Sequence, residues 1–158
     1  MRRREFIQGA ASTCLELKQF ISQRGAKTLI ADGETQQSLD AYKPFIAAKA
    51  IDVFQGDMNR FGIEGILTEA AWCQAQGLTV GPHNWGSLIG FYMQLHIGRA
   101  ITNLYRAEHD PLTTDVLIAE GYRIQDGSCH VPDSPGFGLR INDDQFAAKA
   151  RVNFDLRL

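Results

Sequence analysis

The chain has 158 residues, with 16 Lys and Arg against 18 Asp and Glu and a net charge of −2. This balance argues against a nucleic-acid-binding protein, because no surplus of positive charge is available to neutralise phosphates. No apolar run approaches the roughly 18 residues of a membrane-spanning helix, so no membrane partner is expected. Three cysteines without a CxxC pair give little support to a disulfide framework or a structural zinc site.

Residues 1–14 allow two interpretations. They can form a charged terminus that begins a helix, or they can be a remnant of a twin-arginine-like export signal, carried by Arg3-Arg4-Glu5-Phe6-Ile7. An export signal needs an apolar stretch after the arginines, and here that stretch is short and ends at Glu16. We therefore expect a cytoplasmic protein, with export as the alternative.

From residue 15 the chain alternates between helical and extended patterns. Apolar residues at helical spacing predict a helix from residue 15 that ends at Gly25. Short apolar runs predict strands at residues 28–31, 51–55, 78–80 and 101–106, and further helices are predicted at residues 38–49, 63–76 and 87–100. Ser38 is the expected N-cap of the second helix. Strand followed by helix, in units of roughly 25 residues, indicates an α/β fold with a parallel sheet.

After Pro111 the pattern changes to short extended pieces. They are expected at residues 116–118, at 121–125 and around 131, followed by a tight turn at 135–138. Asp143 or Asp144 is expected to cap a short last helix that runs through Lys149. The sequence thus divides into an N-terminal segment at 1–14, an α/β region at 15–111 and an irregular tail at 112–158.

A polar residue stands at the end of each predicted strand. These residues are Glu34, Asp57, His83 and Glu108, roughly 25 residues apart. In a parallel barrel the C-terminal ends of all strands face the same side, so one group per strand would meet in one pocket. A polar residue after two apolar ones can also mark only the point where a strand leaves the core. This alternative explains any single residue, but it explains four polar residues at regular spacing less well.

The same residues resemble a known family. Residues 27–139 resemble the C-terminal half of the barrel domain of the enolase superfamily, in its mandelate racemase and muconate lactonizing enzyme-like branch. The resemblance implies a partial TIM-type (β/α) barrel of about four βα units with an irregular C-terminal tail. It is carried by Ala31-Asp32-Gly33-Glu34, Asp52-Val53-Phe54-Gln55-Gly56-Asp57, Pro82-His83-Asn84, Ala107-Glu108-His109-Asp110 and Pro132-Asp133-Ser134-Pro135-Gly136-Phe137-Gly138-Leu139.

The resemblance also implies a chemistry. Such enzymes hold a substrate carboxylate with Mg²⁺, and a base removes the proton from the adjacent carbon. By position, Glu34 corresponds to a metal ligand, and His83 with Asp57 to an acid/base dyad in which the aspartate orients the imidazole. Glu108 corresponds to the group that hydrogen-bonds the substrate carboxylate. A loop histidine with a structural hydrogen bond is the alternative for His83.

Four further residues are candidate contacts to a small carboxylic or sugar acid. Arg60 follows Asp57 by three positions, where the family often carries a basic residue, although a surface arginine is the alternative. Asn84 and Trp85 follow the proposed base, and His109 adjoins Glu108. With His83 as the one visible base, acid-sugar dehydration (a lyase reaction) is slightly preferred over racemisation or epimerisation (isomerase reactions).

The family pattern is only partly present. Two further metal carboxylates, a lysine base and a capping domain have no counterpart in these 158 residues. Because Mg²⁺ needs several oxygen ligands, we expect the chain to be inactive alone. A half-barrel also exposes strand edges and an apolar sheet face, so we expect a homo-oligomer or pairing with a missing barrel half. The alternative function is a non-catalytic half-barrel that serves as an assembly or binding module.

Overall fold

The computed structural model describes the backbone of residues 3–150 and the side chains of residues 9–150. The chain forms two compact units, Met1–Asp110 and Pro111–Leu158, which are described separately. The arginine motif of the export alternative falls in the first helix, but its side chains lie outside the described residues.

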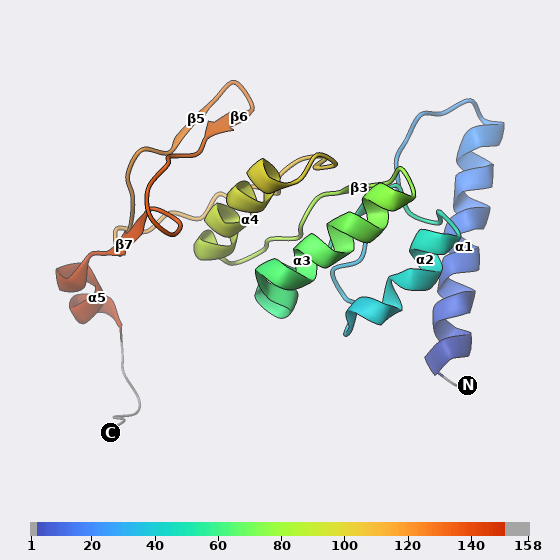
Figure 1. Ribbon diagram of the computed structural model, residues 1–158, viewed down its shortest axis with the longest axis horizontal. Coiled ribbons are helices and arrows are strands. Elements are labelled where there is room, and N and C mark those ends of the chain that lie inside the picture. Colours follow the sequence, from blue (N-terminus) through green and yellow to red (C-terminus); the bar gives the residue numbers. More distant parts are fainter. Residues whose placement is uncertain (1–2, 151–158) are drawn as a thin grey trace. The chain divides into compact units, whose positions relative to one another are not determined.

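The first unit alternates short strands with helices (Figure 1). Its elements are α1 (Arg3–Gln23), β1 (Ala31–Asp32), the 3₁₀ helix η1 (Leu39–Ala41), α2 (Lys43–Ala47), β2 (Val53–Phe54), α3 (Met58–Ala75), β3 (Thr79–Val80) and α4 (Leu88–Ala100). Helix α2 lies beside α1, and α4 lies beside α3. This order confirms the predicted α/β fold.

Three parallel strands form the sheet in chain order, β1-β2-β3. Ala31 pairs with Val53, and Val53 pairs with Thr79. The fourth strand predicted at 101–106 is reduced to a single parallel bridge between Val80 and Leu104. Within the described residues, that segment has β3 on one side and no strand on the other. Its strand pairing is therefore limited to the bridge with β3. The first unit therefore contains three consecutive parallel strands and one bridged segment, each strand followed by a helix.

Helix α1 is longer than the pattern from residue 15 predicted. It begins at Arg3, and Ala10, Ala11 and Cys14 of this earlier part pack against the core. Ala11 is 95% buried, with a relative exposure of 5%. The helix ends as predicted at Gly25, which adopts φ 65°, while Ala26 N donates to Ile21 O.

Two of the predicted helices are divided in the structure. Residues 38–49 form η1 and then α2, because Pro44 in the first turn of α2 cannot donate a main-chain hydrogen bond to the preceding turn. Ser38 is the N-cap of η1, but its side chain makes no capping hydrogen bond. Helix α3 has an extra first turn before Gly62, whose φ of 64° and ψ of −173° separate it from the long part. The long part begins where the sequence predicted, at residue 63.

The core of the first unit lies between the sheet and helices α1, α2 and α3. It is made of apolar side chains from the strands and from the helix faces turned toward them. The central members have almost no exposed surface: Tyr42, Phe45, Ile46, Ala50, Ile51, Phe54, Ala70, Cys73, Leu78 and Val80. Met58, Ile66 and Ile97 form a second cluster between α3 and α4.

The second unit consists of two short antiparallel pairs and a helix. Strand β4 (Leu117–Ala119) pairs with β7 (Leu139–Ile141), and β5 (Arg123–Gln125) forms a hairpin with β6 (Ser128–His130). Helix α5 (Asp143–Lys149) is capped by Asn142, whose Oδ1 accepts from Gln145 N at 3.2 Å. The cap is therefore one residue before the predicted Asp143 or Asp144, because Asn142 is the last extended residue.

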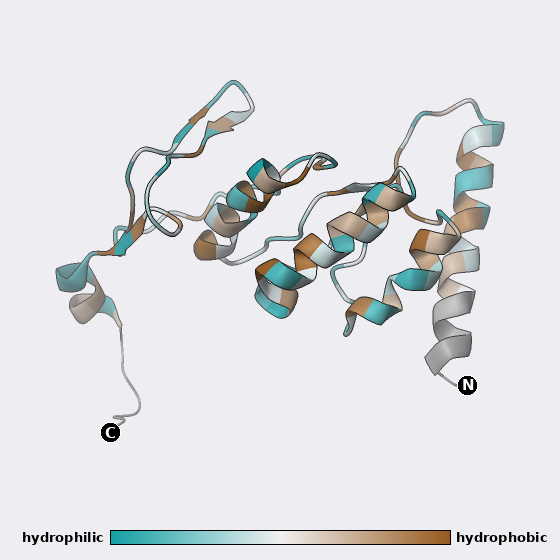
Figure 2. Cartoon of the chain, viewed as in Figure 1, coloured by the Kyte–Doolittle hydropathy of each residue, from teal (hydrophilic) through white to brown (hydrophobic). Residues whose placement is uncertain are grey.

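Polar residues recur along the helices in Figure 2. Within the part of the chain that the structure describes, no helix combines the length and the apolar character needed to cross a membrane.

Candidate active site

The C-terminal ends of the parallel strands bring the predicted polar residues to one edge of the sheet. Asp57 follows β2 and His83 follows β3, and the two form an isolated parallel bridge. His83 N donates to Gly56 O at 3.0 Å. The main chain therefore fixes the histidine next to the aspartate before any side-chain contact is made.

The side chains of His83 and Asp57 are joined by a hydrogen bond. His83 Nδ1 lies 2.9 Å from Asp57 Oδ2, and each side chain is 17% exposed. Because an ionised carboxylate only accepts, Nδ1 carries the proton of this hydrogen bond. Asp57 is itself held by α3, since its Oδ1 accepts from Asn59 N at 2.7 Å and Arg60 N at 3.1 Å as the N-cap.

The second nitrogen of the imidazole faces two further carboxylates. His83 Nε2 lies 3.0 Å from Glu34 Oε2 and 4.0 Å from Glu108 Oε2. Glu34, after β1, is 49% exposed, whereas Glu108 is 34% exposed and accepts from Asn84 N at 2.7 Å. All four predicted strand-end residues therefore meet around one ring, which puts three acids within reach of one base.

The predicted substrate-contact residues occupy different environments. Arg60 Nη1 donates to Gln36 O at 3.0 Å. Trp85 is 71% exposed next to the dyad, while Asn84 is fully buried and its side-chain nitrogen and oxygen have no partner among the described residues. His109 packs on the ring of Phe91, with ring centres 4.8 Å apart. Their roles toward a substrate stay predictions.

Two polar residues at this edge were not predicted. Gln94, on α4, is fully buried and exchanges hydrogen bonds with the main chain of Glu108. Asp110 is 6% exposed and its Oδ2 accepts from Gly86 N at 2.6 Å, in the loop that follows the dyad. A signal for Gln94 exists in the sequence, since it interrupts the apolar face of the helix predicted at 87–100.

The oxygen ligands available for Mg²⁺ are few. Among the described residues, no group of three or more His, Cys, Asp and Glu side chains is arranged to hold a metal ion. Asp57 uses both oxygens on His83 and α3, which leaves Glu34 as the half-exposed carboxylate. Because Mg²⁺ requires near-octahedral oxygen ligation, the described residues do not form a complete Mg²⁺ site by themselves.

A buried acid lies directly behind the site. Glu69, on α3, has no exposed surface, and neither carboxyl oxygen has a hydrogen-bond partner of good geometry among the described residues. Its carboxyl lies against the main chain of Gly56, which precedes Asp57. Burial raises the pKa of Glu69 to about 8, and the Gly56 backbone opposes this only in part. Burial and then the Glu69 charge raise the pKa of Tyr42, whose hydroxyl donates to Gly33 O at 2.8 Å.

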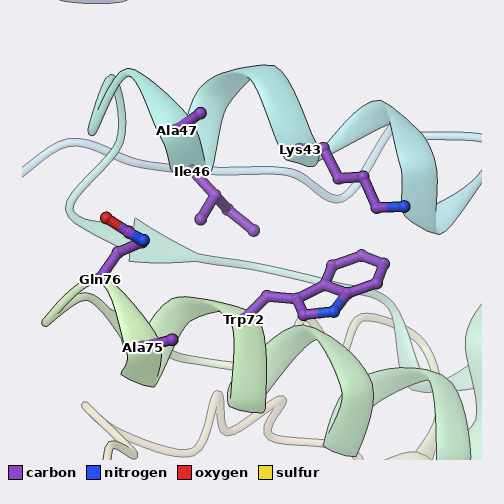
Figure 3. Close-up of a pocket in the computed structure, with 6 residues that line it drawn as sticks. All are labelled: Lys43, Ile46, Ala47, Trp72, Ala75 and Gln76. Atoms are coloured by element: carbon purple, nitrogen blue, oxygen red, sulfur yellow. The ribbon is translucent and has the colours of Figure 1, made fainter.

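A surface hollow between α2 and α3 is separate from this site. It has a volume of about 250 Å³ and is lined by Lys43, Ile46, Ala47, Trp72, Ala75 and Gln76 (Figure 3). The Lys43 ammonium lies 4.8 Å from the centre of the Trp72 ring. None of the four strand-end residues lines it, so it belongs to the outer helical layer.

Comparison with known proteins gives a consistent match. Residues 12–145 match the family described as enolase C-terminal domain-like. A D-gluconate dehydratase from Thermoproteus tenax is 29% identical over 119 residues, which cover 72% of this chain and 24% of that protein. A D-galactonate dehydratase family member from Pseudarthrobacter chlorophenolicus is 30% identical over 128 residues, which cover 77% of this chain and 31% of that protein.

Solved structures show the same likeness. Galacturonate dehydratase from a Geobacillus species, complexed with D-galacturonate and 5-keto-4-deoxy-D-galacturonate, has a TM-score of 0.77 and 32% identity and covers 87% of this chain and 37% of that one. A mutant of that enzyme complexed with Mg has the same TM-score and identity. The chain spans about a quarter to a third of the length of these curated relatives.

Proposed function

Because this chain belongs to the enolase C-terminal domain-like family, we propose that its strand-end site serves Mg²⁺-dependent removal of the proton next to a carboxylate. The observation that carries the proposal is the meeting of Glu34, Asp57 and Glu108 around the His83 imidazole. The family assignment agrees with the resemblance seen in the sequence. The relatives are named dehydratases and cycloisomerases, that is, lyases and isomerases.

The acid/base role falls to His83. Its Nδ1 is engaged by Asp57, so Nε2 is the atom that takes a proton from the substrate carbon or returns one to it. Asp57 keeps the ring in that tautomer and orientation, and its own position is fixed by two main-chain amides of α3. The dyad is thus preorganised, because neither side chain has to move before proton transfer.

Glu34 and Glu108 are proposed to act on the carboxylate end of the substrate. Glu108 would hydrogen-bond the substrate carboxylate. Glu34 would supply one ligand to Mg²⁺, and the other ligands would come from outside the described residues. When bound, Mg²⁺ supplies positive charge that stabilises the anion left after proton removal. Arg60, Trp85 and His109 are proposed as the surrounding substrate contacts. Asn84, whose side chain is fully buried, is proposed to act through its main-chain amide, which donates to Glu108.

The proposed substrates are hydroxy or sugar acids, and dehydration is the preferred reaction. Relatives of about 30% identity are named D-gluconate, D-galactonate and galacturonate dehydratases. A single histidine is sufficient for elimination, because the proton that it removes from carbon can be passed to the departing hydroxyl, which leaves as water. Racemisation needs bases on both faces of the substrate. Within the described residues the strand ends contribute one such base, His83.

The active form is proposed to be an assembly, with the isolated chain inactive. Strand β1 has a neighbour on one side only in the described sheet, and an unpaired strand edge favours pairing with another strand. A second copy or a separate barrel half would cover this edge and could bring further carboxylates to Glu34. The alternative, a non-catalytic assembly or binding module, is favoured by the incomplete metal ligation among the described residues.

The test is proton exchange measured separately from product formation. The assembled form of the chain is incubated in D₂O with Mg²⁺ and D-gluconate, D-galactonate or D-galacturonate. NMR follows deuterium uptake at the carbon next to the carboxylate and formation of a keto-deoxy acid. His83→Asn should abolish both signals, while His96→Asn, on α4, should leave them unchanged. Absence of both signals from a defined assembly that binds Mg²⁺ would favour the binding module.

A further inference from the structure

The segment that carries Glu108 has little support from the sheet. Its strand pairing within the described residues ends at the bridge between Val80 and Leu104. Glu108 follows four residues later, in an extended stretch that β3 no longer pairs with. A side chain placed there without other support would be free to swing away from the dyad.

A buried glutamine takes the place of the missing strand partner. Gln94 has no exposed surface; its Nε2 donates to Glu108 O at 2.5 Å, and Glu108 N donates to its Oε1 at 3.0 Å. Such a reciprocal pair is what two directly opposed residues exchange in an antiparallel ladder. Both hydrogen bonds are partly buried, and breaking them leaves the buried amide of Gln94 without its partners.

We propose that Gln94 is a positioning residue that holds the main chain of Glu108, so that the Glu108 carboxylate lies beside His83. The carboxylate in this position accepts from Asn84 N at 2.7 Å and lies 4.0 Å from His83 Nε2. The α4 helix is thereby connected to the dyad through Gln94 and Glu108. The inference rests on the proposed function only for the role of Glu108, because the hydrogen bonds exist whatever the reaction is.

The amide of Asn84 reports on this arrangement. A main-chain N–H that donates to a carboxylate resonates downfield, and its shift changes when that carboxylate is protonated. Two-dimensional ¹⁵N–¹H NMR across a pH series therefore follows the contact with Glu108 directly. Glu108→Gln identifies the contribution of Glu108, which is the part of the pH-dependent change in the Asn84 resonance that this variant removes.

Three variants test the proposal. Gln94→Met keeps the length of the side chain without either hydrogen bond and should remove the downfield shift of Asn84 and its pH dependence. Gln94→Glu keeps an acceptor for Glu108 N but loses the donor, and should give a reduced shift. Gln74→Met is the matched control: Gln74 Nε2 donates to Thr102 Oγ1 at 2.8 Å, on the same segment but away from Glu108. It should leave Asn84 unchanged.

Unchanged Asn84 shifts in both Gln94 variants would overturn the proposal, as would an equal loss in the Gln74 control. If Gln94→Met does not fold, the Asn84 shift of Gln94→Glu tests the proposal instead. The result is independent of the proposed function: an altered Asn84 signal with no proton exchange in any assembly would retain the role of Gln94 and reject the reaction. Proton exchange together with an unaltered Asn84 signal would support the reaction and reject the role of Gln94.

Discussion

Replacement of Glu69 by glutamine tests the effect of a buried acid on the stability of this fold. The change keeps the size and shape of the side chain and removes its ionisation. Glu69 has no exposed surface, and burial raises its pKa from 4.5 to about 8. In the unfolded chain the same carboxyl group is in water and ionises in the usual acidic range.

The sign of the effect follows from proton binding. Between pH 4.5 and about 8 the folded chain keeps a proton on Glu69 that the unfolded chain has lost. The free energy of unfolding therefore falls as pH rises through this window. The contribution of the protonated Glu69 to the free energy of unfolding is complete below pH 4.5 and is lost as pH rises through about 8. At about 1.4 kcal/mol per pH unit, the loss is on the order of 5 kcal/mol.

Urea unfolding of the wild type and Glu69→Gln at pH 5, 6, 7, 8 and 9, at one protein concentration, measures this loss. The two should differ by about 1 kcal/mol or less at pH 5, where both side chains are neutral. At pH 9 the variant should be the more stable by about 4–5 kcal/mol. Glu64→Gln, an exposed position on the same helix, is the control and should keep the wild-type pH dependence. Parallel pH profiles for the wild type and Glu69→Gln would refute the reasoning.

Three other predictions concern residues around the site. Asp57→Ala should lower the free energy of unfolding by about 1 kcal/mol because it removes the N-cap of α3, whereas Asp57→Asn, which also caps helices, should change it little; equal losses in urea unfolding would contradict this. Gly56→Ala should destabilise the fold by about 1–3 kcal/mol, because a Cβ there overlaps the Glu69 carboxyl and lies 2.8 Å from Ile66 Cδ1. The loss should shrink in a Glu69→Ala background, and an additive double mutant would reject the contact. In calorimetry combined with light scattering, Mg²⁺ should bind only to a defined oligomer, and Glu34→Gln should weaken that binding by about tenfold or more; tight binding to a monomer would be evidence against it.

Several features of the fold follow from local sequence patterns. The end of α1 at Gly25 and the start of α4 after Ser87 depend on contacts within a few residues, so they can be predicted from the sequence. The alternation of strand and helix predicts parallel strands, and parallel strands place Asp57 beside His83 without further information. These predictions succeeded because the physical cause of each feature lies within one strand–helix unit or in its repetition.

Other features could not be predicted because their causes lie far apart in the chain. The strand expected at 101–106 has the composition of a strand, but its length depends on a second neighbour that the described sheet lacks. The burial of the Asn84 side chain could not be predicted, because it depends on the packing of α4. The helix expected at 38–49 is divided into η1 and α2, with Pro44 in the first turn of α2. The proline is a local signal, but the helical pattern of the surrounding residues had more weight in the prediction.

The sequence by itself determined the order of strands and helices, the family resemblance and the identity of the strand-end residues Glu34, Asp57, His83 and Glu108. Only the tertiary structure decided how these groups are held: the pair of hydrogen bonds from Gln94 to Glu108, and the burial of Glu69 behind Gly56. A period along the chain reveals which face of an element is apolar. It does not reveal which polar side chain on that face finds a partner, because the partner comes from another element.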